Sequence, residues 1–85
     1  MILGDRIRQL REQRGMSQAA LARTLEASNM AINFLEKGVT RAPHIDRLIA
    51  IANLFNVSID YLVGLTDDPR PPRKRPRSRP AQPVG

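Results

Sequence analysis

The stretch that decides the fold is residues 17–36, SQAALARTLEASNMAINFLE. Ser17 and Ser28 each precede a run with apolar residues at helical spacing, and a serine there caps a helix by accepting from a backbone amide one turn in. Only Glu26, Ala27 and Ser28 separate the two runs. We therefore predict two short helices joined by a three-residue turn, the arrangement of a helix-turn-helix. The spacing alone fits an ordinary corner in a helical bundle equally well.

Three further runs predict an all-α fold, a compact bundle of five short helices that contains the helix-turn-helix. The first covers residues 4–14, is ended by Gly15 and places Arg6 on its solvent side. Pro43 is predicted in the first turn of the fourth helix, and Ser58 caps the fifth. The side chains of the fourth helix that we expect to face the core are Ile45, Leu48, Ile49, Ala52 and Phe55.

The net charge of +6 is unevenly distributed along the chain. Residues 1–68 carry equal numbers of basic and acidic side chains, whereas residues 69–85 carry the whole excess and no acid. Repeated prolines exclude regular structure there, and few apolar side chains are present to form a core. We predict a folded domain over residues 1–66 and a disordered, Pro/Arg-rich basic tail over residues 67–85.

Composition excludes several classes of function. The chain has no cysteine and a single histidine, His44, so we expect no metal site and no cofactor. No nucleophile–base pair or glycine-rich phosphate loop is present, and we predict that the protein is not an enzyme. No signal peptide or membrane-length apolar run follows Met1, so we expect a cytoplasmic protein without a membrane partner.

Residues 4–64 resemble the lambda-repressor-like helix-turn-helix family, which comprises Cro proteins, phage repressors and xenobiotic-response-element regulators. The resemblance rests on Gly4–Arg8, Gly15-Met16-Ser17-Gln18, Leu35-Glu36-Lys37-Gly38 and Asn56–Leu62, all in register. It implies double-stranded DNA as partner and Arg11 with Glu36 as a structural ion pair. It also implies a role in DNA binding for Gln18, Ser28, Asn29, Met30, Asn33, Phe34, Lys37, Thr40 and Arg41.

Within that set, the resemblance assigns different roles to different positions. Gln18 matches a glutamine that contacts a phosphate and the recognition helix. The positions that match those facing base edges are Ser28, Asn29, Met30, Asn33 and Phe34. Lys37, Thr40 and Arg41 match a loop that touches the sugar-phosphate backbone. The fifth helix, with Ile59 and Tyr61, matches a surface where related proteins pair, so we expect a homodimer.

Two features depart from the family pattern. Glu26 stands where the family has glycine at a positive φ angle, which costs a glutamate roughly 1 kcal/mol. Met30 and Phe34 are apolar where polar or basic side chains are common. They either contact thymine methyl groups or form a patch for a protein partner.

The tail sequence Lys74–Pro80 is similar to an AT-hook, although Ser78 replaces its central glycine. The tail contacts DNA either as a sequence-independent polycation or in an A·T minor groove. The basic residues predicted to make these contacts are Arg73, Lys74, Arg75, Arg77 and Arg79.

These features together predict a sequence-specific DNA-binding transcriptional regulator, a repressor that acts as a dimer on a palindromic operator. We expect no small-molecule ligand, because the chain has no second domain to hold one. The alternative is an antitoxin or another protein-interaction module of the same fold, in which Met30 and Phe34 bind the partner.

Overall fold

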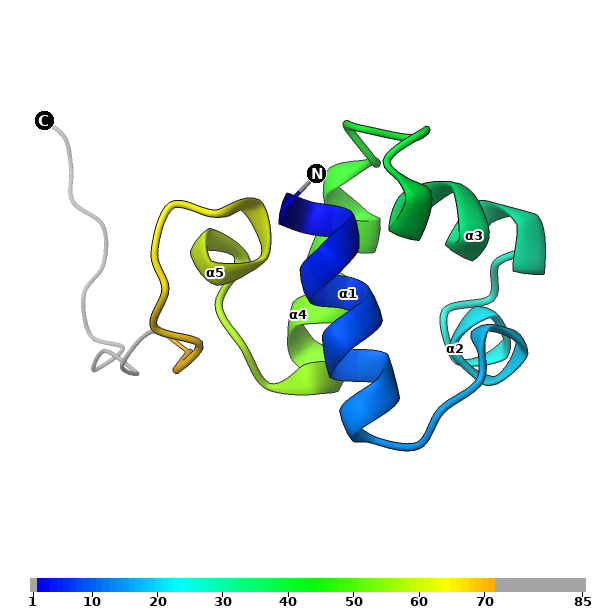
Figure 1. Cartoon of the computed structure of the whole chain (residues 1–85), viewed down its shortest axis with the longest axis horizontal. Coiled ribbons are helices and arrows are strands. Elements are labelled where there is room, and N and C mark those ends of the chain that lie inside the picture. Colours follow the sequence, from blue (N-terminus) through cyan, green and yellow to red (C-terminus); the bar gives the residue numbers. More distant parts are fainter. Residues whose placement is uncertain (1, 72–85) are drawn as a thin grey trace, which may run out of the picture.

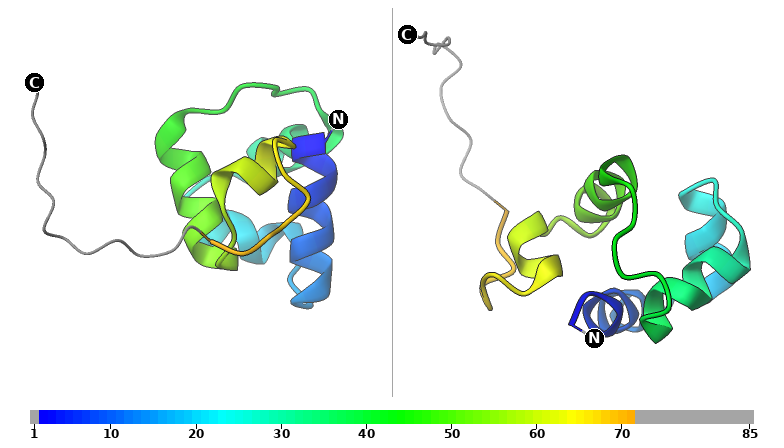
Figure 2. Two further views of the ribbon diagram at one scale, coloured as in Figure 1. Left: turned by 90° about the vertical axis from the view of Figure 1, so that its left-hand side faces the viewer. Right: turned by 90° about the horizontal axis from the view of Figure 1, so that it is seen from above.

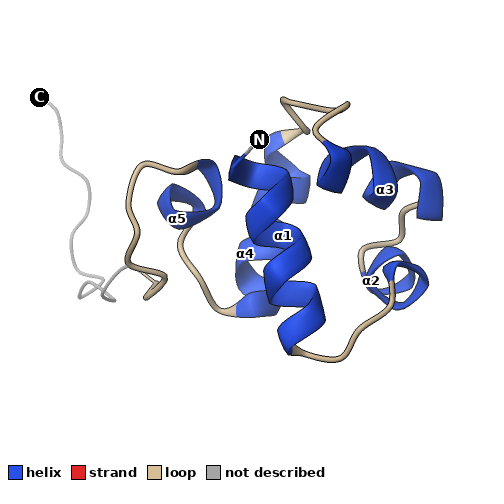
Figure 3. Ribbon diagram, in the orientation of Figure 1, coloured by secondary structure: helices blue, strands red, loops and turns tan. Residues whose placement is uncertain are grey.

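Five helices surround one core in residues 2–71, the part of the chain that this computed structural model describes (Figure 1). The helices are α1 (Ile2–Gln13), α2 (Gln18–Thr24), α3 (Asn29–Lys37), α4 (Ile45–Phe55) and α5 (Ile59–Val63). The predicted all-α bundle is confirmed, and no strand occurs within residues 2–71 (Figure 3). Over the same residues, no helix is long and apolar enough to cross a membrane.

The helix ends follow from local sequence. The hydroxyl oxygens of Ser17, Ser28 and Ser58 each accept from the backbone N–H three residues on, at 3.0 Å. These are the predicted N-caps, and they satisfy amides that a helix leaves unpaired at its start. Gly38 and Asn56 adopt left-handed φ angles of 81° and 55° and end α3 and α4, as expected for a chain leaving a helix.

Buried apolar side chains from all five helices form a single core. Helix α1 packs against α3 and α5, α2 packs against α3, and α4 packs against α5 (Figure 2). Gly4 brings α1 especially close to α3, because a Cβ atom there would lie 2.6 Å from the Glu36 carbonyl oxygen. The core side chains are Leu3, Ile7, Leu21, Ala22, Ile32, Leu35, Ile51, Ala52, Phe55, Val57 and Leu62.

Two sequence-based predictions about α4 are wrong. Pro43 is not in the first turn of the helix, because His44 is the N-cap and its Nδ1 accepts from the backbone N–H of Asp46 at 3.2 Å. Ile45 and Ile49 do not face the core either, with 53% and 42% of their surfaces exposed. Ile51 is fully buried, so the face of α4 that carries Ile51 is the one that packs against the core.

Arg6 was predicted on the solvent side of α1, and that is wrong as well. Its guanidinium carbon lies 4.1 Å from the Tyr61 ring centroid, and the group donates to the carbonyl oxygen of Tyr61. It also donates to the Thr66 carbonyl oxygen at 2.7 Å and to the Asp67 carboxylate at 2.8 Å. Arg6 thereby holds residues 61–67 against α1.

The segment after α5 remains in contact with the helices. The backbone N–H of Ser58 donates to the carbonyl oxygen of Pro69 at 3.2 Å, so residues 66–69 run back past the start of α5. The division into a domain over residues 1–66 and a disordered tail over residues 67–85 stays a prediction. Residues 72–85 lie outside the described part of the chain.

The turn between α2 and α3 contains backbone strain that a substitution can release. Glu26 has a φ angle of +57°, a conformation that disfavours side chains with a Cβ atom. We expect Glu26→Gly to stabilise the protein by about 1 kcal/mol and to raise its melting temperature by about 5 °C. Thermal unfolding followed by circular dichroism measures both.

The matched control is Glu12→Gly, the same replacement on the exposed side of α1. There the glycine occupies a helical conformation, so it should destabilise the protein by about 1 kcal/mol. A Glu26→Gly protein that melts at or below the wild-type temperature would contradict the assignment of strain to this turn.

Candidate nucleic-acid interface

Helix α3 presents two neighbouring stripes of side chains outside the core. Asn29 and Asn33 are four residues apart and form one stripe, the amide stripe. Met30 and Phe34 have the same spacing and form the other, the apolar stripe, with 63% and 38% of their surfaces exposed. Residues four apart lie above one another on a helix, so both stripes run along its axis.

Ile32 and Leu35 lie on the opposite side of α3 and are fully buried, which fixes the rotation of the helix. Ser28, its N-cap, is exposed beside the two stripes, and Lys37 is exposed in the last turn. The structure thus brings the predicted base-facing residues to a single surface, except that Asn33 is half-buried by its contacts with α2.

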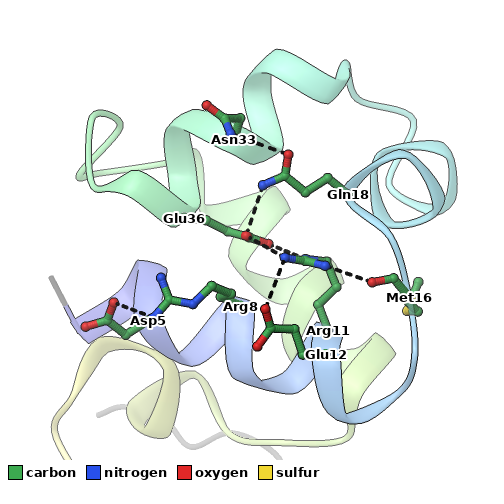
Figure 4. A network of polar contacts seen from close by, with 8 residues as sticks. All are labelled: Asp5, Arg8, Arg11, Glu12, Met16, Gln18, Asn33 and Glu36. Carbon is green, nitrogen blue, oxygen red and sulfur yellow. Dashed lines mark hydrogen bonds and ion pairs between the residues drawn. The ribbon is translucent and has the colours of Figure 1, made fainter.

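A chain of polar contacts runs from α1 through the core to the amide stripe (Figure 4). Nε of Arg11 donates to Oε2 of Glu36 at 2.6 Å, and its NH2 group donates to Oε1 at 2.9 Å. Nε2 of Gln18 donates to the same Oε1 at 3.1 Å, and Nδ2 of Asn33 donates to Oε1 of Gln18 at 3.4 Å. The predicted ion pair of Arg11 with Glu36 is present in this geometry.

The buried end of this chain is a fully ionised pair. Burial by itself raises the pKa of Glu36, but hydrogen bonds from Arg11 and Gln18 and the nearby arginine charges outweigh it and lower the pKa overall. The hydrogen bond to Glu36 raises the pKa of Arg11 further. Arg11 also donates to the carbonyl oxygen of Met16 at 2.8 Å, which fixes the segment that leads into α2.

The carboxylate determines the direction of the whole chain of hydrogen bonds. Ionised Glu36 only accepts, so Gln18 turns its NH2 group inward and its carbonyl oxygen toward α3. Asn33 then donates to Gln18 and keeps its own carbonyl oxygen and its second N–H outside these contacts. One acceptor and one donor of Asn33 are therefore available in a fixed order on the surface of α3.

The loop after α3 carries the remaining predicted contacts. The backbone N–H groups of Val39 and Thr40 both donate to the carbonyl oxygen of Phe34, at 2.9 and 3.2 Å. This turn places Thr40 and the exposed Arg41 just beyond Lys37, beside the end of α3. The predicted tail contacts at Arg73, Lys74, Arg75, Arg77 and Arg79 lie outside the described residues.

Sequence reasoning missed the roles of Arg6, which lies in α1, and of Arg14, which lies in the turn that follows α1. Arg6 is placed over Tyr61, as described above. The guanidinium of Arg14 donates to the carbonyl oxygens of Leu54 and Phe55 at 3.3 and 3.1 Å and lies 5.3 Å from the Phe55 ring centroid. Their partners are 40 or more positions away in the chain, so no local pattern signals these contacts.

Comparison with known proteins identifies relatives of this arrangement. Residues 7–62 match the model of a protein family described as helix-turn-helix. The chain is 36% identical over 71 residues to the uncharacterized HTH-type transcriptional regulator YobD of Bacillus subtilis (strain 168). That match covers 84% of the chain and 62% of the relative, so the chain spans less than two thirds of the relative's length.

Two solved structures of DNA complexes share the fold. The P22 c2 repressor protein in complex with synthetic operator 9T superposes with a TM-score of 0.69 and 35% identity, covering 74% of this chain and 94% of that one. SinR, a master regulator for biofilm formation, in complex with DNA has a TM-score of 0.66 and 26% identity, covering 72% and 97%.

Because Arg11 and Glu36 form a buried ion pair, we expect the single substitution to lower the stability of the protein much more than the double substitution. Arg11→Met leaves a buried carboxylate without its cation, and we expect a loss of about 3 kcal/mol in the free energy of unfolding. Arg11→Met combined with Glu36→Leu removes both charges and should recover most of that loss. Urea unfolding at pH 7 measures the three proteins.

Arg8→Met is the matched control, because Arg8 pairs with Asp5 at the surface at 3.4 Å. An exposed pair of this kind contributes at most about 1 kcal/mol. Additive losses in the double variant would show that the two charges do not act as a buried pair.

Proposed function

The chain belongs to the helix-turn-helix family, and we propose that it is a sequence-specific, double-stranded-DNA-binding transcriptional regulator. The observation that supports this proposal most directly is the outer face of α3, where the amide and apolar stripes lie outside the core. A helix with such a face fits the width of the major groove. The likeness to a repressor bound to a synthetic operator supports the same mode of binding.

Each surface residue has a part in the proposed complex. Ser28, Asn29, Met30, Asn33 and Phe34 face the base edges, whereas Lys37, Thr40 and Arg41 contact the sugar-phosphate backbone. Asn33 holds one acceptor and one donor ready, which is the pair that an adenine edge requires. The second amide hydrogen of Gln18 donates to a phosphate oxygen and so attaches α2 to the DNA. The carbonyl oxygen of Gln18 accepts from Asn33 and holds that side chain in place.

We further propose that the protein is a repressor that binds a palindromic operator as a homodimer. Ile59 and Tyr61, the predicted contact residues, are both half-buried in the monomer. Ile59 lines a groove together with Ile49, whose exposure on α4 provides additional apolar surface for a second copy. A symmetric pair presents two recognition helices to half-sites about one helical turn apart.

The alternative that the structure supports with a specific observation is a protein-interaction module, including an antitoxin. Met30 is 63% exposed and lies one turn from Phe34, so the two side chains offer an apolar contact surface. In that case the protein partner covers the apolar stripe and binding to DNA is weak. Both alternatives describe binding and not catalysis.

Replacement of the amide stripe separates these functions. With duplex DNA from upstream of its own gene, Asn29→Ala/Asn33→Ala should lose at least about tenfold in affinity relative to wild type, because each asparagine removed can make a bidentate contact. Fluorescence anisotropy measures the affinity, with an unrelated duplex of equal length as competitor. The interaction module predicts weak, sequence-independent binding by both proteins.

Gln9→Ala/Gln13→Ala is the matched control, since these two amides have the same spacing on the exposed side of α1. This control should bind like the wild type. Equal losses in the two double variants would rule out α3 as the recognition helix.

The basic tail supplies a separate prediction about salt. Ending the chain after Pro71 removes five positive charges, so the plot of log affinity against log salt should become shallower by up to about 4.5 units. A full-length variant with residues 72–85 in scrambled order keeps the charge. If it retains the wild-type slope and affinity, the tail acts as a polycation, whereas a selective loss on A·T-rich duplexes assigns it to the minor groove. An unchanged slope after truncation would exclude the tail from the DNA interface.

A further inference from the structure

The two side chains of the apolar stripe of α3 are not among those that form the core. Met30 is 63% exposed and Phe34 is 38% exposed, while Ile32 and Leu35 on the other side of the helix already fill the core. An exposed methionine and phenylalanine one turn apart form a contact surface that water hydrates poorly. The stripe also runs directly beside the amide stripe, so any molecule that lies along α3 meets both.

The proposed occupant of this surface contains a matching apolar group. In the major groove, the 5-methyl group of thymine is the one apolar feature that a base pair presents. Cytosine offers an amino donor, and the two purines offer acceptors together with either a donor or a second acceptor. Met30 and Phe34 cannot bond to any of these polar groups, but they can bury a methyl group.

The spacing of the two side chains sets the spacing of the methyl groups. Residues four apart on a helix are about 6 Å apart along its axis, and successive base pairs of B-DNA are about 3.4 Å apart. Met30 and Phe34 therefore reach methyl groups one or two base pairs apart. An A·T pair carries both a methyl group and the adenine edge that suits Asn33, so the two stripes favour the same base pairs.

We infer that Met30 and Phe34 determine operator specificity by burying thymine 5-methyl groups one or two base pairs apart in each half-site. This inference rests on the proposed function, because it requires α3 to lie in the major groove. It assigns the apolar stripe to DNA and not to a protein partner. It also explains how a recognition helix with only one basic side chain, Lys37, discriminates between sequences.

Uracil provides a direct test, since deoxyuridine pairs as thymidine does and lacks only the methyl group. The best duplex is first selected from a random pool with the full-length protein. Each dT of that duplex is then replaced singly by dU, and the affinity is measured by fluorescence anisotropy. We expect one or two positions per half-site to weaken binding by about fourfold each, the effect of exposing one buried methyl group.

Variants of the apolar stripe test whether its side chains cause this loss of affinity. Phe34→Ala and Met30→Ala should each bind dU and dT equally at one of the sensitive positions. Leu65→Ala removes a side chain that is 77% exposed and follows α5, so it should retain the full wild-type ratio. Thermal unfolding of each variant verifies that the fold is retained.

Salt gives a second measurement. Burial of a methyl group releases no counterions, so the ratio of dT to dU affinity should stay constant while both affinities fall with rising salt.

The outcomes are distinguishable. Selection of no preferred duplex would overturn the proposed function itself. Specific binding that no dU replacement weakens would overturn the inference and leave the proposed function in place. Undiminished dU sensitivity in both Phe34→Ala and Met30→Ala would also overturn it, and the apolar stripe would then belong to a protein partner.

Discussion

The buried ion pair of Arg11 with Glu36 is the interaction on which the rest of the structure depends. It connects the end of α1 to the end of α3, and its carboxylate accepts from both the guanidinium and Gln18 of α2. Three helices therefore meet at one charged group that is only 6% exposed. Gly4 permits this, because α1 must approach the backbone of α3 more closely than a residue with a Cβ atom allows. The orientation of α3 is fixed at its C-terminal end by charge and at its start by the Ser28 cap.

This arrangement also determines how the positive charge of the protein is used. Arg6 and Arg11 of α1, and Arg14 in the turn that follows it, all donate to backbone carbonyl oxygens or carboxylates of other elements. Three of the eight basic side chains of residues 1–68 are thus engaged in holding the fold together. The proposed reading face of α3 is correspondingly poor in charge, and the excess lies in residues 69–85. In the proposed function, the tail supplies general attraction to DNA while the uncharged face of α3 selects the sequence.

Local chemistry explains which parts of the fold were predictable. The serine caps and the helix end at Gly15 depend on one or two neighbouring positions, and the structure confirms them. The turn before α3 was predicted as Glu26 to Ser28, but α2 already ends at Thr24, so the turn is one residue longer than predicted. The rotation of α4 depends on what packs against it, so helical spacing alone did not distinguish Ile51 from Ile49. The same reason applies to Arg6, whose partners lie 55 or more residues away. The ion pair was predicted only through the family resemblance, and the roles proposed for α3 and the tail remain predictions.

The polar chain and the apolar stripe together constrain what kind of specificity this surface can have. Asn33 is held by Gln18, and Gln18 by a buried carboxylate, so its acceptor and donor cannot exchange places without breaking the hydrogen bonds behind it. In the proposed complex, a wrong base opposite Asn33 would leave a desolvated polar group unpaired, which is costly. A missing methyl opposite Phe34 would cost only the burial of that group. Sequence selection should therefore be strict at the position that Asn33 faces and graded at the positions that Met30 and Phe34 face. The two stripes differ in this way because hydrogen bonds connect the amide stripe to the buried ion pair, whereas the apolar stripe can interact only by van der Waals contact and burial.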